Sequence, residues 1–188
     1  MAAGSVTAAD RGPGILIKNP TSLTVPGADG AYGGTLLGLS RDHEIAMMDT
    51  PITVPGEELG GAPTEQIEGG KWCVFGALFR GFDDDALATI YANTATGAST
   101  GKKVIRIGTG QSVKAGHRVS DRAVKLLFVP KKSSKRAVII YRALPGIRED
   151  SRTALTILRE STHAVTFVGM PDATGRVAEV GRLADLTL

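Results

Sequence analysis

Two glycine-rich segments come close to motifs that bind phosphate. Residues 96–103 (TGASTGKK) resemble a phosphate-binding loop, which needs two glycines separated by four intervening residues, then Lys, then Ser or Thr. Only three residues separate Gly97 from Gly101, and Lys103 stands where the metal-binding hydroxyl is needed. Residues 108–110 (GTG) lack the third glycine of a dinucleotide-binding motif. We therefore expect no nucleotide site in either segment.

A run of three carboxylates and a single cysteine are the next candidates for chemistry. Residues 83–85 are all Asp and could supply oxygen ligands to a hard cation. They equally fit the start of a helix, where Asp83 caps the first turn and negative charge is favourable. Cys73, the one cysteine, lies in the most apolar segment, which predicts a buried and unreactive thiol.

The histidines show no metal-binding or catalytic spacing. Each stands alone in its segment, and the three are His43, His117 and His163. No serine lies on the strand–turn–helix motif of a hydrolase nucleophile. The sequence thus predicts no catalytic residue, no cofactor and no metal, and we expect the chain not to be an enzyme. A pair of carboxylates that meets only in space stays open.

The elements that would position any site are short and β-like. Clusters of Gly and Pro separate segments rich in Val, Ile, Leu and Thr, which is typical of an all-β domain. A hairpin turn is expected at residues 161–162 and another turn at 171–175. Strands are expected at residues 15–19, 35–39, 43–54, 72–81, 103–108, 123–130, 136–144, 153–159, 163–170 and 176–181.

Three segments add detail to this picture. Residues 83–93 predict one helix of about three turns, with an apolar stripe at i, i+3 and i+4. Residues 72–79 are apolar on both faces, which predicts a strand between two layers. In residues 123–129 the face with Val124, Leu126 and Phe128 is the better core candidate, because Lys125 shares the other face with Leu127. The fold class is therefore all-β, a β-sandwich or β-barrel, with one inserted α-helix.

Charge is divided unevenly along the 188 residues, which carry a net charge of +3. Residues 1–100 hold 5 Lys and Arg against 12 Asp and Glu, whereas residues 101–188 hold 17 against 7. Three interpretations stay open: neutralisation inside one domain, nucleic-acid binding by the basic half, or head-to-tail association of copies.

The domain organisation follows from the same survey. Residues 1–12 are expected to be a flexible tail, and residues 13–188 a single β domain with a long projecting loop at about residues 50–70. That loop is rich in Gly and Glu, and loops of such length usually have a function. The longest apolar run, residues 72–79, is too short to cross a bilayer, and residues 1–13 lack the pattern of a signal peptide. A chain with open strand edges, opposite charges and no site suits a subunit that assembles with itself.

The order of several short motifs resembles the tail tube proteins (major tail proteins) of tailed bacteriophages and phage-derived particles. Residues 19–25 (NPTSLTV) and 34–39 (GTLLGL) resemble the usual opening, an added strand that leads to a Gly-Thr-x-Leu-Gly element. The Glu- and Gly-rich connection at residues 50–70 and the closing strand–turn–strand at residues 167–176 (FVGMPDATGR) follow in the same order. The resemblance covers roughly residues 15–182.

This resemblance implies a fold, an assembly and a location. It implies two packed antiparallel sheets with one flanking helix, and rings of six copies that stack into a hollow tube through which DNA passes without sequence-specific binding. The protein would be made and assembled in the host cytoplasm and reside in the virion tail. Its partners would be copies of itself and other tail proteins, namely the tape measure, terminator and distal tail proteins, with no membrane involved.

Carried onto this sequence, the resemblance makes residues 50–70 the loop that contacts the next ring. Its acidic candidates are Glu57, Glu58, Glu65 and Glu68. The basic counterparts that we expect on the other ring are Lys131, Lys132, Lys135 and Arg136. Alternatives are a tail terminator, a distal tail protein, the inner tube of a contractile tail, a β-barrel that binds a small ligand, and a nucleic-acid-binding module in residues 101–188.

Overall fold

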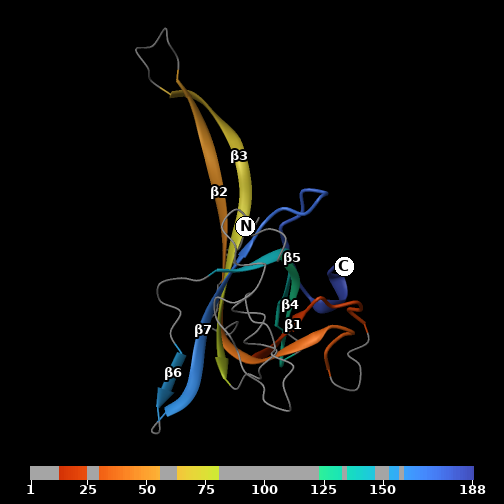
Figure 1. The fold of residues 1–188 in the computed structure, drawn as a ribbon. Coiled ribbons are helices and arrows are strands. Elements are labelled where there is room, and N and C mark those ends of the chain that lie inside the picture. Colours follow the sequence, from red (N-terminus) through yellow and green to blue (C-terminus); the bar gives the residue numbers. More distant parts are fainter. Residues whose placement is uncertain are drawn as a thin grey trace, which may run out of the picture.

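The computed structural model describes residues 13–24, 30–55, 63–80, 123–132, 135–146, 153–156 and 159–188 (Figure 1). This part of the chain is all-β, as the sequence predicted. The helix expected at residues 83–93 and the strand expected at 103–108 lie outside it. The elements are β1 (Gly14–Lys18), β2 (Thr35–Pro55), β3 (Pro63–Arg80), β4 (Val124–Pro130), β5 (Ala137–Gly146), β6 (Thr153–Thr156), β7 (Arg159–Gly169), β8 (Ala178–Gly181) and the 3-10 helix η5 (Leu183–Asp185).

The strands form one antiparallel sheet that closes into a barrel. Their order is β6-β7-β3-β2-β1-β4-β5-β8, and β7 pairs in addition with β5. This second pairing joins β7, β3, β2, β1, β4 and β5 into a closed ring of six strands. Two packed sheets are therefore not observed among the described residues. The reason is that β7 pairs with β3 along one edge and with β5 along the other, so that the sheet closes on itself.

β2 is a single strand where the sequence predicted two. The residues between the expected strands stay within it, and the ladder with β3 shifts register between Arg41 and Glu44. Asp42 has a φ of 53°, a left-handed conformation that Asp tolerates better than most residues. This irregularity bends β2, so that its first part pairs with β1 and its later part pairs only with β3.

The barrel interior is a closely packed apolar core. The sequence predicted that residues 72–79 are covered on both faces, but only one face is fully buried. Phe75 and Phe79 point into the core, whereas Trp72 and Val74 on the opposite face are half-buried. Cys73 is fully buried, as predicted. The core consists of Leu16, Leu37, Cys73, Phe75, Ala77, Phe79, Leu126, Phe128, Val138, Ile140, Ala143, Val165, Phe167 and Val177.

A second, smaller core covers the outside of β1, β4 and β5. Ile17, Leu127 and Ile139 are fully buried there, beneath Leu186 of the C-terminal segment. The sequence favoured the Leu126 face of β4 as the core face, and that face is buried, but Leu127 on the other face is fully buried as well. Leu127 shares its face with Lys125, but a neighbouring segment that sequence periodicity does not reveal covers Leu127.

Side-chain hydrogen bonds hold the C-terminal residues against this second core. The Glu179 carboxylate accepts bonds from the Thr187 backbone N–H at 2.9 Å and its hydroxyl at 2.6 Å. Tyr141 Oη donates to the Thr187 carbonyl at 3.2 Å. Burial and the bond with Glu179 raise the pKa of Tyr141, whereas the bonds from Thr187 lower the pKa of Glu179.

β7 and β8 both pair with the same edge of β5, at different positions along it. β7 pairs with the end of β5 and β8 with its beginning, and between them Met170 N–H donates to the Arg142 carbonyl and Tyr141 N–H to the Val177 carbonyl. Residues 171–176 leave this edge and return to it, which matches the turn expected there. The hairpin turn expected at residues 161–162 is wrong, because both lie inside β7, where Thr162 pairs with Arg80.

Candidate functional site

The largest feature outside the barrel is an arm formed by the distal parts of β2 and β3 (Figure 1). We define the arm as residues 49–71, of which 49–55 and 63–71 are described. The ladder continues from Asp49, paired with Lys71, to Pro55, paired with Pro63. Pairing of β3 with β7 begins only at Cys73, and β1 pairs with β2 only up to Ser40. In the described part of the arm, each strand thus has an open backbone edge.

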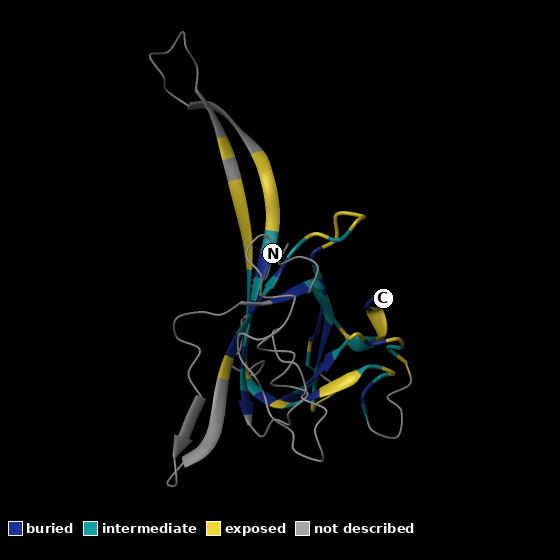
Figure 2. Cartoon of the chain, viewed as in Figure 1, coloured by how far each residue is buried: buried dark blue, intermediate teal, exposed yellow. Residues whose placement is uncertain are grey.

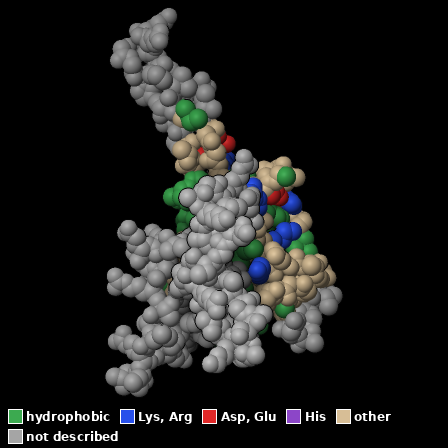
Figure 3. Space-filling model, in the orientation of Figure 1, with side chains coloured by type: hydrophobic (Ala, Val, Ile, Leu, Met, Phe, Trp, Pro, Cys, Tyr) green, Lys and Arg blue, Asp and Glu red, His purple; other side chains and the backbone are tan. Residues whose placement is uncertain are grey.

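The arm and its base expose large apolar side chains. Ile52 on the arm is 55% exposed, and Met47 and Met48 at its base are 59% and 40% exposed. Figure 2 shows this hairpin as largely exposed, and Figure 3 shows hydrophobic side chains on the arm and at its base. Large apolar side chains gathered on a projecting ribbon are typical of an interaction surface.

The acidic residues predicted for stacking are placed as follows. Glu68 is exposed and pairs with Lys71 of the same strand at 2.9 Å, a contact that raises the pKa of Lys71. Glu65 lies in the ladder opposite Val54, but its side chain is not described. Glu57 and Glu58 lie outside the described residues. Between residues 49 and 70 the sequence holds five acids and no Lys or Arg, so the arm is acidic as a whole.

The predicted basic residues lie in the turn between β4 and β5, which we call the basic turn (residues 131–136). Lys131, Lys132 and Arg136 are exposed, and Lys135 is half-buried. The turn is anchored where Lys131 N–H donates to the Pro13 carbonyl at 3.0 Å. The exposed cations Lys131, Lys132 and Arg136 are accessible to an external acidic surface.

The strand registers place the basic turn at the barrel end opposite the arm. Pro130, the last residue of β4, pairs with Gly14, and Gly14 pairs with Ser40. Ser40 in turn pairs with Phe79, one residue before the end of β3. The arm leaves the barrel at the other end of β3, beyond Cys73. Six residues of strand separate these two levels, a distance of about 20 Å.

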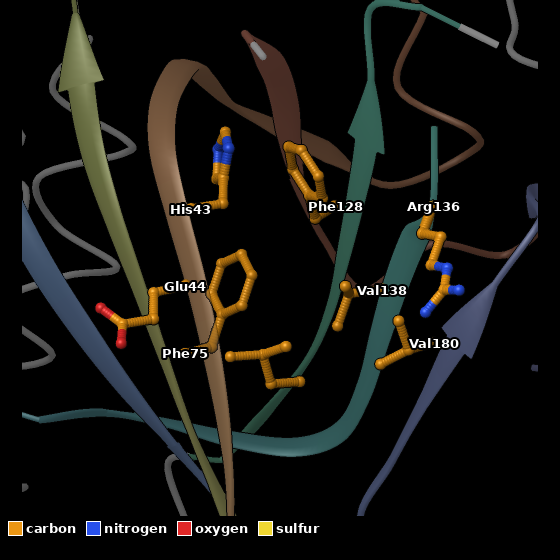
Figure 4. A pocket seen from close by; sticks show the side chains of 8 residues that line it. His43, Glu44, Phe75, Phe128, Arg136, Val138 and Val180 are labelled. Carbon is orange, nitrogen blue, oxygen red and sulfur yellow. The ribbon is translucent and has the colours of Figure 1, made fainter. Parts of the chain in front are cut away.

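A hollow of about 170 Å³ lies beside the basic turn, between β2 on one side and β5 and β8 on the other (Figure 4). The imidazole of His43 packs on Phe128 with ring centroids 3.8 Å apart and on Phe75 at 5.9 Å. His43 Nε2 is held 2.8 Å from the hydroxyl of the fully buried Ser40. The lining consists of His43, Glu44, Ile45, Phe75, Phe128, Arg136, Val138 and Val180.

This hollow suits a small apolar group beside a cation. Pockets for drug-sized ligands usually measure about 300–1,000 Å³, which is considerably larger. An apolar cavity of about 150 Å³ can hold one benzene ring. Its size therefore fits a single apolar side chain or a molecule of that size. Arg136 and His43 were identified separately from the sequence, but the hollow was not, because its walls come from five strands far apart in the chain.

Among the described residues, Asp172 has the most strongly shifted carboxyl pKa, and the shift has a structural cause. Partial burial alone would raise the pKa of Asp172, but bonds from the N–H and hydroxyl of Thr174 and from Arg176 hold it far below its ordinary value. Arg176 in turn stacks 4.0 Å from the Tyr141 ring centroid. Asp172 thus organises residues 171–176 rather than a reaction centre.

Burial raises the pKa of the Cys73 thiol.

The described residues hold neither a metal-binding cluster nor a candidate membrane helix. They contain no cluster of three or more His, Cys, Asp or Glu side chains suited to a metal ion. No helix among them has the length and apolar character needed to cross a membrane. In comparisons with known proteins, no family model matches the chain and no curated protein is similar to it.

Proposed function

We propose that this chain is a structural subunit of the tail-tube type, which assembles with copies of itself into rings that stack into a hollow tube for DNA. A subunit of this kind needs surfaces that another copy can complete. The arm supplies the observation that supports the proposal most directly. Its open strand edges, its exposed Ile52 and the exposed Met48 at its base gain from burial against a second chain.

The relative position of the charged elements adds support. The acidic arm and the basic turn lie at opposite ends of the barrel, so each would meet its counterpart on the next copy along an axis. Such a head-to-tail contact repeats, and it forms closed rings or open stacks according to its rotation. In this proposal six copies form a ring, and the chain carries no catalytic residue.

Negative-stain electron microscopy of the purified protein at high concentration tests the proposal. We expect hollow rings or tubes from the wild type. Met48→Asp combined with Ile52→Asp should abolish them, because burying carboxylates in the contact is costly. The matched control is Leu188→Asp, an exposed apolar residue away from the arm, which should assemble normally. A uniformly monomeric wild type would contradict the proposal.

The stacking charges have a separate test. Reversing Glu57 and Glu58 to Lys should shorten the tubes and lower the salt concentration at which they dissociate, because like charges would then face the basic turn. Asp185→Lys, at an exposed acid near the C-terminus, is the control. Unchanged tube length and salt stability would show that the arm does not stack through these charges.

A barrel that binds a small ligand is the second candidate, and the hollow beside His43 favours it. Small aromatic carboxylates match its apolar walls and its one guanidinium. A monomer that is stabilised in a thermal shift assay by such a compound, with no assembly at any concentration, would favour this function over the first.

A further inference from the structure

The hollow and the arm are complementary in shape and polarity. The hollow offers apolar walls from Phe75, Phe128 and Val138, with Arg136 at its rim. The Glu44 carboxylate also belongs to the lining, but it points away from Arg136 (Figure 4). The arm carries an exposed apolar side chain, Ile52, on an acidic ribbon. Arg136 belongs both to the hollow and to the basic turn, so an acidic partner that approaches the turn also approaches the hollow.

A chain cannot fill its own hollow with Ile52. Ile45 lines the hollow, and Ile52 lies seven residues farther along the same strand, about 20 Å away. The arm points away from the barrel (Figure 1), and the basic turn is at the opposite end. A second copy placed head to tail can bring its own Ile52 to this hollow.

We propose that the hollow of one copy receives the Ile52 side chain from the arm of a second copy, while acidic residues of that arm face Arg136 and the basic turn. This inference rests on the proposed function and adds the residues that form the contact. An Ile side chain is smaller than the 170 Å³ space and larger than a water molecule, so it displaces water from apolar walls. The flanking charges select the orientation of the arm.

Disulfide trapping tests the contact directly. A chain with Ile52→Cys and Val180→Cys carries one thiol on the arm and one at the hollow, and both positions are exposed enough to accept the change. A disulfide forms only if the two Cα atoms come within about 7 Å. Under mild oxidant at assembling concentration, we expect a ladder of covalent multimers on a non-reducing gel. Cys73 is fully buried and should not react.

The controls separate the inference from the proposed function. Each single variant should give at most a dimer, and Ile52→Cys with Leu188→Cys should give no ladder. If microscopy shows tubes but the paired variant forms no ladder, or if the Leu188 pair forms one equally, the inference is wrong and the proposed function stands. If the wild type forms no rings or tubes, both are wrong.

Filling the hollow provides an independent readout. Val180→Trp should occupy the space and raise the concentration needed for assembly by about tenfold or more, as expected for the loss of a central contact residue. Leu188→Trp, which adds the same bulk elsewhere on the surface, should leave that concentration within about twofold. Equal effects of the two substitutions would overturn the inference.

Discussion

Replacing Gly169 with Ala perturbs the place where the barrel closes. Gly169 pairs with Cys73 of β3 on one side and with Ala143 of β5 on the other, so it lies on the row of small residues that joins the two edges of the sheet. A Cβ added at Gly169 would overlap the Cys73 sulfur and lie 2.8 Å from Cγ2 of Ile140. Both neighbours are buried and cannot move aside without cost.

The expected magnitudes follow from this geometry. Overpacking of a closely packed core usually costs about 1–3 kcal/mol, and we expect about 2 kcal/mol for Gly169→Ala. Cys73→Ala alone removes one buried atom and should cost about 1 kcal/mol. In the double variant the lost sulfur makes room for the new methyl group. Its free energy of unfolding should therefore exceed that of Gly169→Ala alone, with a coupling of about 1–2 kcal/mol between the sites.

Urea unfolding of dilute, monomeric protein measures this coupling. Trp72 is the only tryptophan and precedes Cys73 on β3, so its fluorescence reports on the strand at the closure. The reasoning is refuted if the costs of the two substitutions simply add in the double variant. It is refuted equally if Gly169→Ala is as stable as the wild type, because the pairing of β7 with both β3 and β5 would then leave more room than the structure indicates.

Three further predictions concern single side chains. Because the pKa of Asp172 is lowered in the folded state, its carboxylate stabilises the fold above pH 3.8, and this stabilisation is lost as the pH falls toward the folded-state pKa. The wild type should therefore have a higher Tm than Asp172→Asn at about pH 6, and the difference in Tm should shrink in stronger acid. Leu186→Ala should lower the free energy of unfolding in urea by about 2 kcal/mol, because it opens the second core, whereas Leu188→Ala should change it by less than about 0.5 kcal/mol. Ser40→Ala removes the bond to His43 Nε2 and should cost about 1 kcal/mol in the same assay; an unchanged midpoint would show that this bond does not stabilise the barrel.

Strand positions were largely predictable because they depend on local patterns. The apolar run at residues 72–79 correctly predicted a strand and a buried Cys73 thiol, but not that only the face with Phe75 and Phe79 is fully buried. The prediction at residues 161–162 was wrong because Ser and Thr favour turns only weakly, and both also occur in strands. Pairing with β3 decided the outcome for these residues.

Closure of the barrel and the candidate site were not predictable in the same way. Whether β7 meets β5 depends on the register between residues 143 and 169, which no local pattern encodes. The hollow likewise needs His43, Phe128 and Val180 from three separate strands. The arm was anticipated as a projecting loop, but its strand pairing became visible only with the ladder between β2 and β3.

The loop at residues 171–176, between β7 and β8, is a place where the chain should tolerate an insertion. Met170 and Val177 are held by neighbouring residues of β5, Arg142 and Tyr141, so the chain departs and returns at almost the same point. The free-energy cost of lengthening such a closed excursion grows only slowly with its size. A guest peptide spliced between Ala173 and Thr174 would break the bonds from Thr174 to Asp172 but leave the β5 ladder intact. If the subunits polymerise, each would display one copy of the guest at a regular interval.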